Sequence, residues 1–130
     1  MARQQILLVD DDPVFARGAS SLLRNEGFEV LVAEDGAGTV NFLREGSKPD
    51  LILMDVLSPV DAAQAGVSWD GFATMDWLRC VGANQAPVIL LTAGNQAVYV
   101  ERARKAGAVA LFQKSVETAD LVGVIHQLLD

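Results

Sequence analysis

Residues 6–13 of this 130-residue chain read ILLVDDDP, which is four aliphatic residues, three consecutive aspartates and a proline. A short aliphatic run of this kind, bounded by polar residues, indicates a buried strand. Asp12 followed by Pro13 is typical of a helix start, where the aspartate caps the helix and proline takes its first position. The segment therefore predicts a buried strand that passes directly into a helix, with acidic residues at the junction.

The same alternation continues along the rest of the chain. Further strands are predicted at residues 28–33, 51–55, 88–92 and 110–112. Helices are predicted from Pro13 to Gly27, from Asp35 to about Arg44, from Gly71 to about Cys80, and at 96–106 and 118–129. Five strands and five helices in strict alternation indicate the α/β class, with an open, parallel, doubly wound sheet.

Reactive side chains follow four of these strands. Asp10 and Asp11 follow the first strand, and Asp55, Thr92 and Lys114 end or follow the third, fourth and fifth. The carboxyl ends of parallel strands share one edge of the sheet, where open α/β proteins bind ligands. Carboxylates, a hydroxyl and an ammonium group would therefore meet there, an arrangement that suits a divalent cation and a phosphoryl group.

The acidic residues have a structural explanation only in part. Neighbouring carboxylates about 5 Å apart repel by roughly 3 kcal/mol per pair at an effective dielectric near 20. Helix capping explains Asp12, but it does not explain Asp10, Asp11 or Asp55. A bound Mg²⁺ would offset the repulsion, since it prefers oxygen ligands. Taken alone, Thr92 would be an ordinary strand residue and Lys114 an exposed charge, but together they are the partners that a phosphoryl group requires.

Size and charge narrow the class further. The length fits one domain, and 51% of the residues are hydrophobic, so a packed globule is expected. The net charge of -7 argues against direct binding to nucleic acid or to an acidic membrane, and the basic cluster at 102–105 is expected to be a solvated helix face. The single Cys80 cannot form an internal disulfide, and no apolar run approaches the roughly 18 residues of a membrane span. We therefore expect a cytoplasmic protein.

Six segments in order give the chain a family resemblance. They are ILLVDDDP, PDLILMDVLSP, DGF before a helix, PVILLTA, AGA and FQK. Together with the spacings from Asp11 to Asp55 and from Thr92 to Gly107 and Lys114, they resemble the receiver domain of two-component response regulators, the CheY-like superfamily, over essentially the whole length. The resemblance implies a single receiver domain over residues 1–130, with a five-stranded sheet in the flavodoxin-like order 2-1-3-4-5.

The resemblance also implies a role for each matched residue. Asp55 would be the phosphoacceptor, taking a phosphoryl group from a sensor histidine kinase or phosphotransfer protein. Mg²⁺ would be bound by Asp10, Asp11, Asp55 and the backbone carbonyl of Leu57. Lys114 and the Thr92 hydroxyl would contact the phosphoryl oxygens, with the backbone N–H groups of Val56 and Ala93. The domain would not be an enzyme beyond weak self-phosphorylation and self-dephosphorylation, and it would signal to a downstream effector protein or output domain.

Three features depart from the family pattern. A loop insertion at about residues 60–69, within VDAAQAGVSW, is either a tolerated surface loop or a screen over Asp55, with Trp69 at the rim. Ser115 follows Lys114 where the family usually has a cis proline, and Leu111 replaces a common aromatic that rotates with the threonine. A cis bond before a non-proline residue costs about 3–4 kcal/mol, so either the bond before Ser115 is trans and Lys114 is aimed differently, or strain is retained at the site. Leu111 affects the output more than the phosphorylation.

Two other functions are compatible with such a chain. A pseudo-receiver would bind protein partners without taking phosphate, although such domains usually lack one of the aspartate, threonine or lysine residues. A hydrolase with an aspartyl nucleophile usually has a second aspartate two residues further on, where this chain has Leu57. The phosphoacceptor function is therefore favoured.

Overall fold

The computed structural model describes residues 3–34, 36–46, 48–55, 86–92, 96–114 and 118–129. Within these ranges the strands are β1 (Gln5–Val9), β2 (Glu29–Ala33), β3 (Leu51–Asp55), β4 (Val88–Thr92) and β5 (Ala110–Gln113). The helices are α1 (Pro13–Asn25), α2 (Gly36–Arg44), α5 (Gln96–Ala106) and α6 (Thr118–Leu129). These elements match the predicted ones within one or two residues at each end.

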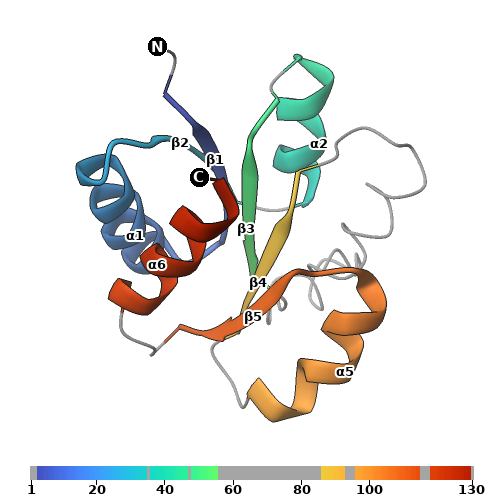
Figure 1. Cartoon of the computed structure of the whole chain (residues 1–130). Helices are drawn as coiled ribbons and strands as arrows, with labels where there is room; N and C mark the ends of the chain where they lie inside the picture. Colours follow the sequence, from blue (N-terminus) through green and yellow to red (C-terminus); the bar gives the residue numbers. More distant parts are fainter. Residues whose placement is uncertain are drawn as a thin grey trace.

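The sheet is parallel throughout and has the order β2-β1-β3-β4-β5, which confirms the predicted class and topology. Helices α1 and α6 cover one face, and α2 and α5 cover the other (Figure 1). Because both faces are covered, the central strands are hydrophobic at every position rather than at alternate ones. β3 shows this most clearly, since its first four residues are completely buried.

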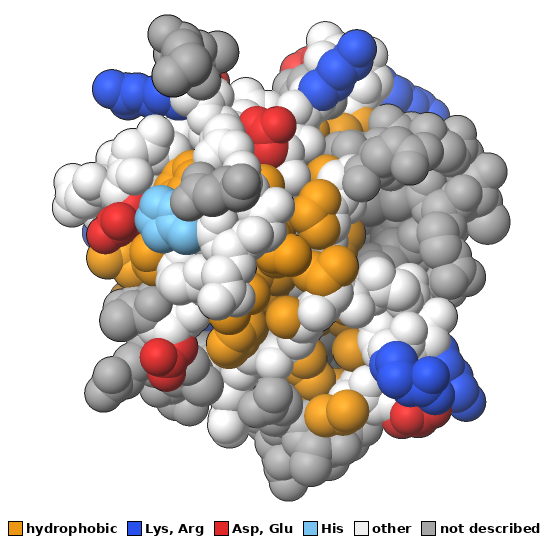
Figure 2. All heavy atoms as spheres, viewed as in Figure 1, with side chains coloured by type: hydrophobic (Ala, Val, Ile, Leu, Met, Phe, Trp, Pro, Cys, Tyr) orange, Lys and Arg blue, Asp and Glu red, His pale blue; other side chains and the backbone are white. Residues whose placement is uncertain are grey.

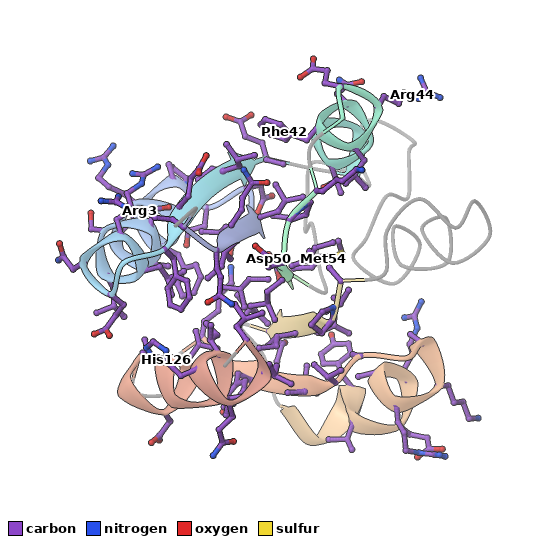
Figure 3. The ribbon with its side chains drawn as sticks, turned by 45° about the horizontal axis from the view of Figure 1, so that its top comes forward. Arg3, Phe42, Arg44, Asp50, Met54 and His126 are labelled. Atoms are coloured by element: carbon purple, nitrogen blue, oxygen red, sulfur yellow. The ribbon has the colours of Figure 1, made fainter. Side chains whose placement is uncertain are left out.

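Alternating side chains of the strands divide the core into two clusters. Leu8, Leu53 and Leu91 pack under α1 and α6. Leu7, Met54 and Leu90 point to the opposite face, where α5 contributes buried alanines and α2 contributes the partly buried Phe42. Figure 3 shows Phe42 on the side of α2 toward the sheet and Arg44 on the side away from it. Each helix therefore lies on the sheet through a narrow apolar stripe.

The start and end of α1 follow the sequence signals. Asp12 is the N-cap, and its Oδ1 accepts hydrogen bonds from the backbone N–H groups of Val14 (3.0 Å) and Phe15 (3.3 Å). Pro13 takes the first helical position, where its missing N–H costs nothing. Gly27 has a φ of 96°, a left-handed conformation that glycine adopts without strain, and it turns the chain toward β2. The helix start is therefore fixed one residue away from the acidic pair.

The last helix meets the core unevenly along its apolar side. Helical periodicity predicts Leu121, Val122, Ile125, Leu128 and Leu129 on that side. In the structure the first three are buried and Leu129 packs partly buried against the core, whereas Leu128 is 40% exposed. Figure 2 shows hydrophobic side chains gathered between α6 and α5 on this face, and basic side chains beside α5. Arg102, Arg104 and Lys105 are exposed there, as predicted.

Several predicted features lie outside the described residues. They are the helix at 71–80, the insertion at 60–69 with Trp69, Cys80, Ser115, the Leu57 carbonyl, and the Val56 and Ala93 N–H groups. Among the helices that the structure does describe, none combines the length and the hydropathy of a membrane span.

Candidate functional site

Strand register brings the predicted site residues to one edge of the sheet. Val9 of β1 pairs with Met54 of β3, so the next residues along the two strands, Asp10 and Asp55, lie side by side. On the far side of β3, the backbone N–H of Lys114 donates to the Thr92 carbonyl (2.8 Å), which joins the ends of β4 and β5. Residues far apart in the sequence therefore meet at the carboxyl edge, as the parallel topology predicts.

Three carboxylates form an acidic cluster at this edge. Asp10, Asp11 and Asp55 each place a carboxylate oxygen within 4.8 Å of the other two. The Asp10 side chain is completely buried, and its Oδ1 accepts a hydrogen bond from the backbone N–H of Asp12 (2.9 Å). Asp11 and Asp55 are partly buried. Water screens these charges only weakly, so the cluster requires a positive partner.

Lys114 provides the positive charge. Its Nζ lies 2.6 Å from Asp10 Oδ2 and 3.3 Å from Asp55 Oδ2, and its side chain is 13% exposed. Asp10 Oδ2 is buried and has no partner with regular hydrogen-bond geometry, so the ionic contact with the ammonium is what compensates it. Lys114 is therefore a member of the cluster and not the exposed surface charge that its sequence position alone would indicate.

The protonation of Lys114 follows from these contacts. Burial by itself would lower the pKa of an ammonium group, because it disfavours the charged form. The contact with Asp10 and the negative charges of Asp55 and Asp10 outweigh burial, and the pKa of Lys114 is raised above its ordinary value of 10.5. The side chain is therefore a fixed cation at neutral pH.

Thr92 and Leu111 lie near the same edge. Thr92 is completely buried at the end of β4. Leu111 of β5 is partly buried and packs against the core cluster under α5. An aliphatic side chain in this place fills part of the core beneath α5, so the departure from the family pattern occurs inside the packed layer.

The donor set fits a magnesium ion. The three clustered carboxylates provide only oxygen atoms, which are the ligands that Mg²⁺ takes. One ammonium against three carboxylates leaves a net negative charge, which favours a further cation.

Asp11→Asn tests the repulsion within the cluster. In EDTA, we expect the free energy of unfolding of this variant, measured with urea, to exceed that of the unsubstituted protein by about 1 kcal/mol. The variant loses one of three neighbouring negative charges, and the Asp11 side chain is only partly exposed to water. The stabilisation that Mg²⁺ gives the unsubstituted protein should fall in the variant. The control is Glu34→Gln at an exposed acid. A variant that is less stable without Mg²⁺ would show that Asp11 is compensated by other groups.

Among the described residues, Phe15 contacts the site in a way that the sequence does not predict. Its spacing with Ala19, Leu22 and Leu23 predicts only a place on the apolar face of α1, but its ring also lies under the Lys114 ammonium, with Nζ 4.8 Å from the ring centroid. The only signal in the sequence was its position, three residues after the N-cap Asp12 and therefore in the first turn of the helix beside the acidic pair.

Comparison with known proteins identifies the class. Residues 6–126 match the family model of the response regulator receiver domain, and the chain belongs to this family of two-component signalling domains. It is 35% identical over 128 residues to the transcriptional regulatory protein PdtaR of Mycobacterium tuberculosis, covering 95% of this chain and 55% of PdtaR. It is 33% identical to the DNA-binding response regulator MtrA of Mycolicibacterium smegmatis, covering 98% of this chain and 51% of MtrA. The chain thus spans about half the length of these relatives.

A solved structure shows the same fold. The response regulator TrrA of Thermotoga maritima, crystallised in complex with Mg²⁺ and BeF, superimposes with a TM-score of 0.79 at 26% identity. The match covers 97% of this chain and 99% of that one. The likeness therefore extends through the whole fold.

Proposed function

We propose that this domain accepts a phosphoryl group from the phosphohistidine of a sensor histidine kinase or phosphotransfer protein onto Asp55, in a Mg²⁺-dependent reaction. The observation that supports it most directly is the gathering of Asp10, Asp11 and Asp55 within 4.8 Å, with the Lys114 ammonium in contact with two of them. Phosphorylation then changes which partner the domain binds. Residues 1–130 act as one receiver domain, with the insertion at about 60–69 as a loop of that domain.

The proposed reaction needs one nucleophile and several fixed charges. An Asp55 oxygen attacks the phosphorus, the P–N bond of the phosphohistidine breaks, and the imidazole nitrogen leaves with the electron pair. Lys114 lies 3.3 Å from Asp55 Oδ2, where it can pair with an oxygen of the incoming group, and the Thr92 hydroxyl donates to another. Asp10, Asp11, Asp55 and the Leu57 carbonyl would bind Mg²⁺, which when bound neutralises charge on the phosphoryl oxygens.

Two further observations support this function. TrrA, a relative of the same fold, has been crystallised with Mg²⁺ and BeF. In this chain Asp55, Thr92 and Lys114 are all present and lie at the same sheet edge. A domain that no longer takes phosphate has no need of a buried ammonium in contact with a phosphoacceptor aspartate, so the phosphoacceptor function is preferred over a pure interaction module.

The partners proposed are proteins. The phosphoryl donor is a histidine kinase or phosphotransfer protein, and the receiver of the signal is an effector protein or an output domain. MtrA is named as a DNA-binding regulator, and this chain spans only 51% of it, so DNA contact in such a relative need not involve a receiver domain. The net charge of -7 also disfavours direct contact of residues 1–130 with nucleic acid.

Intact mass spectrometry tests the proposal. After incubation with acetyl phosphate and Mg²⁺, the protein should gain the mass of one phosphoryl group, and the adduct should be lost in mild alkali or hydroxylamine, as an acyl phosphate is. The same incubation with EDTA should give no adduct. Absence of any adduct with Mg²⁺, in protein shown by NMR to be folded, would instead favour the interaction module.

A further inference from the structure

The ring of Phe15 lies against the one ammonium group of the acidic cluster. Lys114 Nζ is over the ring, 4.8 Å from its centroid, and also contacts Asp10 Oδ2 at 2.6 Å and Asp55 Oδ2 at 3.3 Å. The ammonium is therefore in contact with two carboxylates and with an aromatic face. A cation within about 6 Å of a ring centroid is attracted to the negative face of the ring.

Lys114 and Phe15 also line the same pocket. Its other lining residues are mostly apolar and include Leu22, Leu91, Phe112 and Leu121. These residues come from α1, β4, β5 and α6, so the pocket wall is made by rigid elements on both sides. The Phe15 ring beneath the ammonium is itself partly buried against the core.

The position of the ring is set by the cap of α1. The backbone N–H of Phe15 donates to Asp12 Oδ1 (3.3 Å), and the backbone N–H of Asp12 donates to Asp10 Oδ1 (2.9 Å). Asp10, which contacts the ammonium, and Phe15, whose ring lies under it, therefore belong to one hydrogen-bonded turn. A shift of one would displace the other.

We propose that Phe15 is a positioning residue for Lys114, whose ring face confines the ammonium between Asp10 and Asp55 so that it meets the incoming phosphoryl oxygen. This inference rests on the proposed function of Asp55. A lysine side chain has a flexible four-carbon stem and about 2 kcal/mol of rotamer entropy. Without the ring, the same ammonium would reach these carboxylates from many more conformations, and fewer of them would be productive.

NMR of the metal-free protein tests the contact without any phosphorylation. The ε-methylene protons of Lys114, assigned by their loss in Lys114→Arg, should be shifted upfield by the ring current of Phe15. Phe15→Leu should return them to the range of the other lysines, and Phe15→Tyr should keep the shift. Unshifted protons in the unsubstituted protein would overturn the proposal, whatever its phosphorylation behaviour.

Rate measurements test the consequence. Phe15→Leu keeps an apolar side chain but removes the ring face, and we expect it to slow phosphorylation by acetyl phosphate about three- to tenfold, with Phe15→Tyr close to the unsubstituted protein. Replacing Phe15 by phenylalanines with one, two and three ring fluorines, which keep the shape and weaken the negative face, should lower the rate stepwise. Phe112→Leu, in the same pocket, is the matched control and should change the rate less than twofold.

The outcomes separate this inference from the proposed function. If neither the unsubstituted protein nor any variant is phosphorylated, the proposed function fails. The NMR shift alone then decides whether the ring positions the lysine. If phosphate is taken but Phe15→Leu and the fluorinated series all react within twofold of the unsubstituted protein, the ring is only an apolar wall and the inference is wrong. Equal losses in Phe15→Leu and Phe112→Leu would also contradict it, because pocket packing would then explain both.

Discussion

The Asp55→Asn variant is expected to take no phosphate from acetyl phosphate and Mg²⁺ under conditions in which the unsubstituted protein is modified. The amide has nearly the shape of the carboxylate but is not a nucleophile toward phosphorus. Since Asp55 ends β3 in the middle of the sheet, with its side chain partly buried beside Lys114, the substitution should leave the fold intact. Intact mass and the dispersion of the NMR spectrum measure the two effects separately.

The control for this experiment is Asp50, at the other end of the same strand. Asp50 immediately precedes β3, at the opposite edge of the sheet, where its Oδ2 accepts from the backbone N–H of Gln5 (2.7 Å). Asp50→Asn removes the same charge far from the cluster and should be phosphorylated at the rate of the unsubstituted protein. An adduct that persists in Asp55→Asn would place the nucleophile on another residue and would contradict the proposed function.

Lys114→Met is expected to destabilise the metal-free protein by about 3 kcal/mol, measured by urea unfolding in EDTA. Methionine retains an apolar stem in the pocket, so the loss comes from the charge. Asp10, whose side chain is completely buried, would lose the ammonium 2.6 Å from its Oδ2. Leaving one member of a buried pair without its partner is the costly case, because the remaining charge must be protonated or be exposed to water.

Mg²⁺ should partly reverse this loss. A divalent cation at the cluster supplies the positive charge that Lys114→Met removes, so Mg²⁺ should stabilise the variant more than it stabilises the unsubstituted protein. Because the pKa of Lys114 is raised in the folded state, the difference between the two proteins is fully present below pH 10.5 and declines only as the pH rises past that value. Lys48→Met, at an exposed lysine, is the control and should change stability by less than about 0.5 kcal/mol. A similarly small change for Lys114→Met would mean that other groups compensate the cluster.

The fold could be predicted because its strands are short, continuous apolar runs with clear boundaries. The bounds of β3 and β4 are those predicted from the sequence, since each strand ends on a polar residue and follows a turn signal. Helical periodicity identifies an apolar stripe along α6 but not how deeply each residue of it is buried, and Leu128 is 40% exposed although Leu129 packs against the core. Burial within the stripe depends on the packing angle of the helix, which local sequence does not encode.

The sheet topology predicts which residues gather at the site, but it does not predict the contacts among their side chains. Parallel strand order brings Asp10, Asp55 and Lys114 to one edge whatever the side-chain conformations are. The ammonium lies closer to Asp10 (2.6 Å) than to Asp55 (3.3 Å). This difference depends on the placement of α1 and β5 to within about an ångström. The Phe15 contact depends on the same placement, so only a structure could reveal it.

The turn from Asp10 to Asp12 has a consequence for how substitutions in this family accumulate. Asp10 Oδ1 orders the backbone of Asp12, and Asp12 in turn begins α1, so Asp10 contributes to folding as well as to chemistry. Asp11 has no equivalent part in the helix cap. A lineage drifting toward a phosphate-independent signalling domain would therefore be free to replace Asp11 first, while selection for a folded chain alone would still retain Asp10.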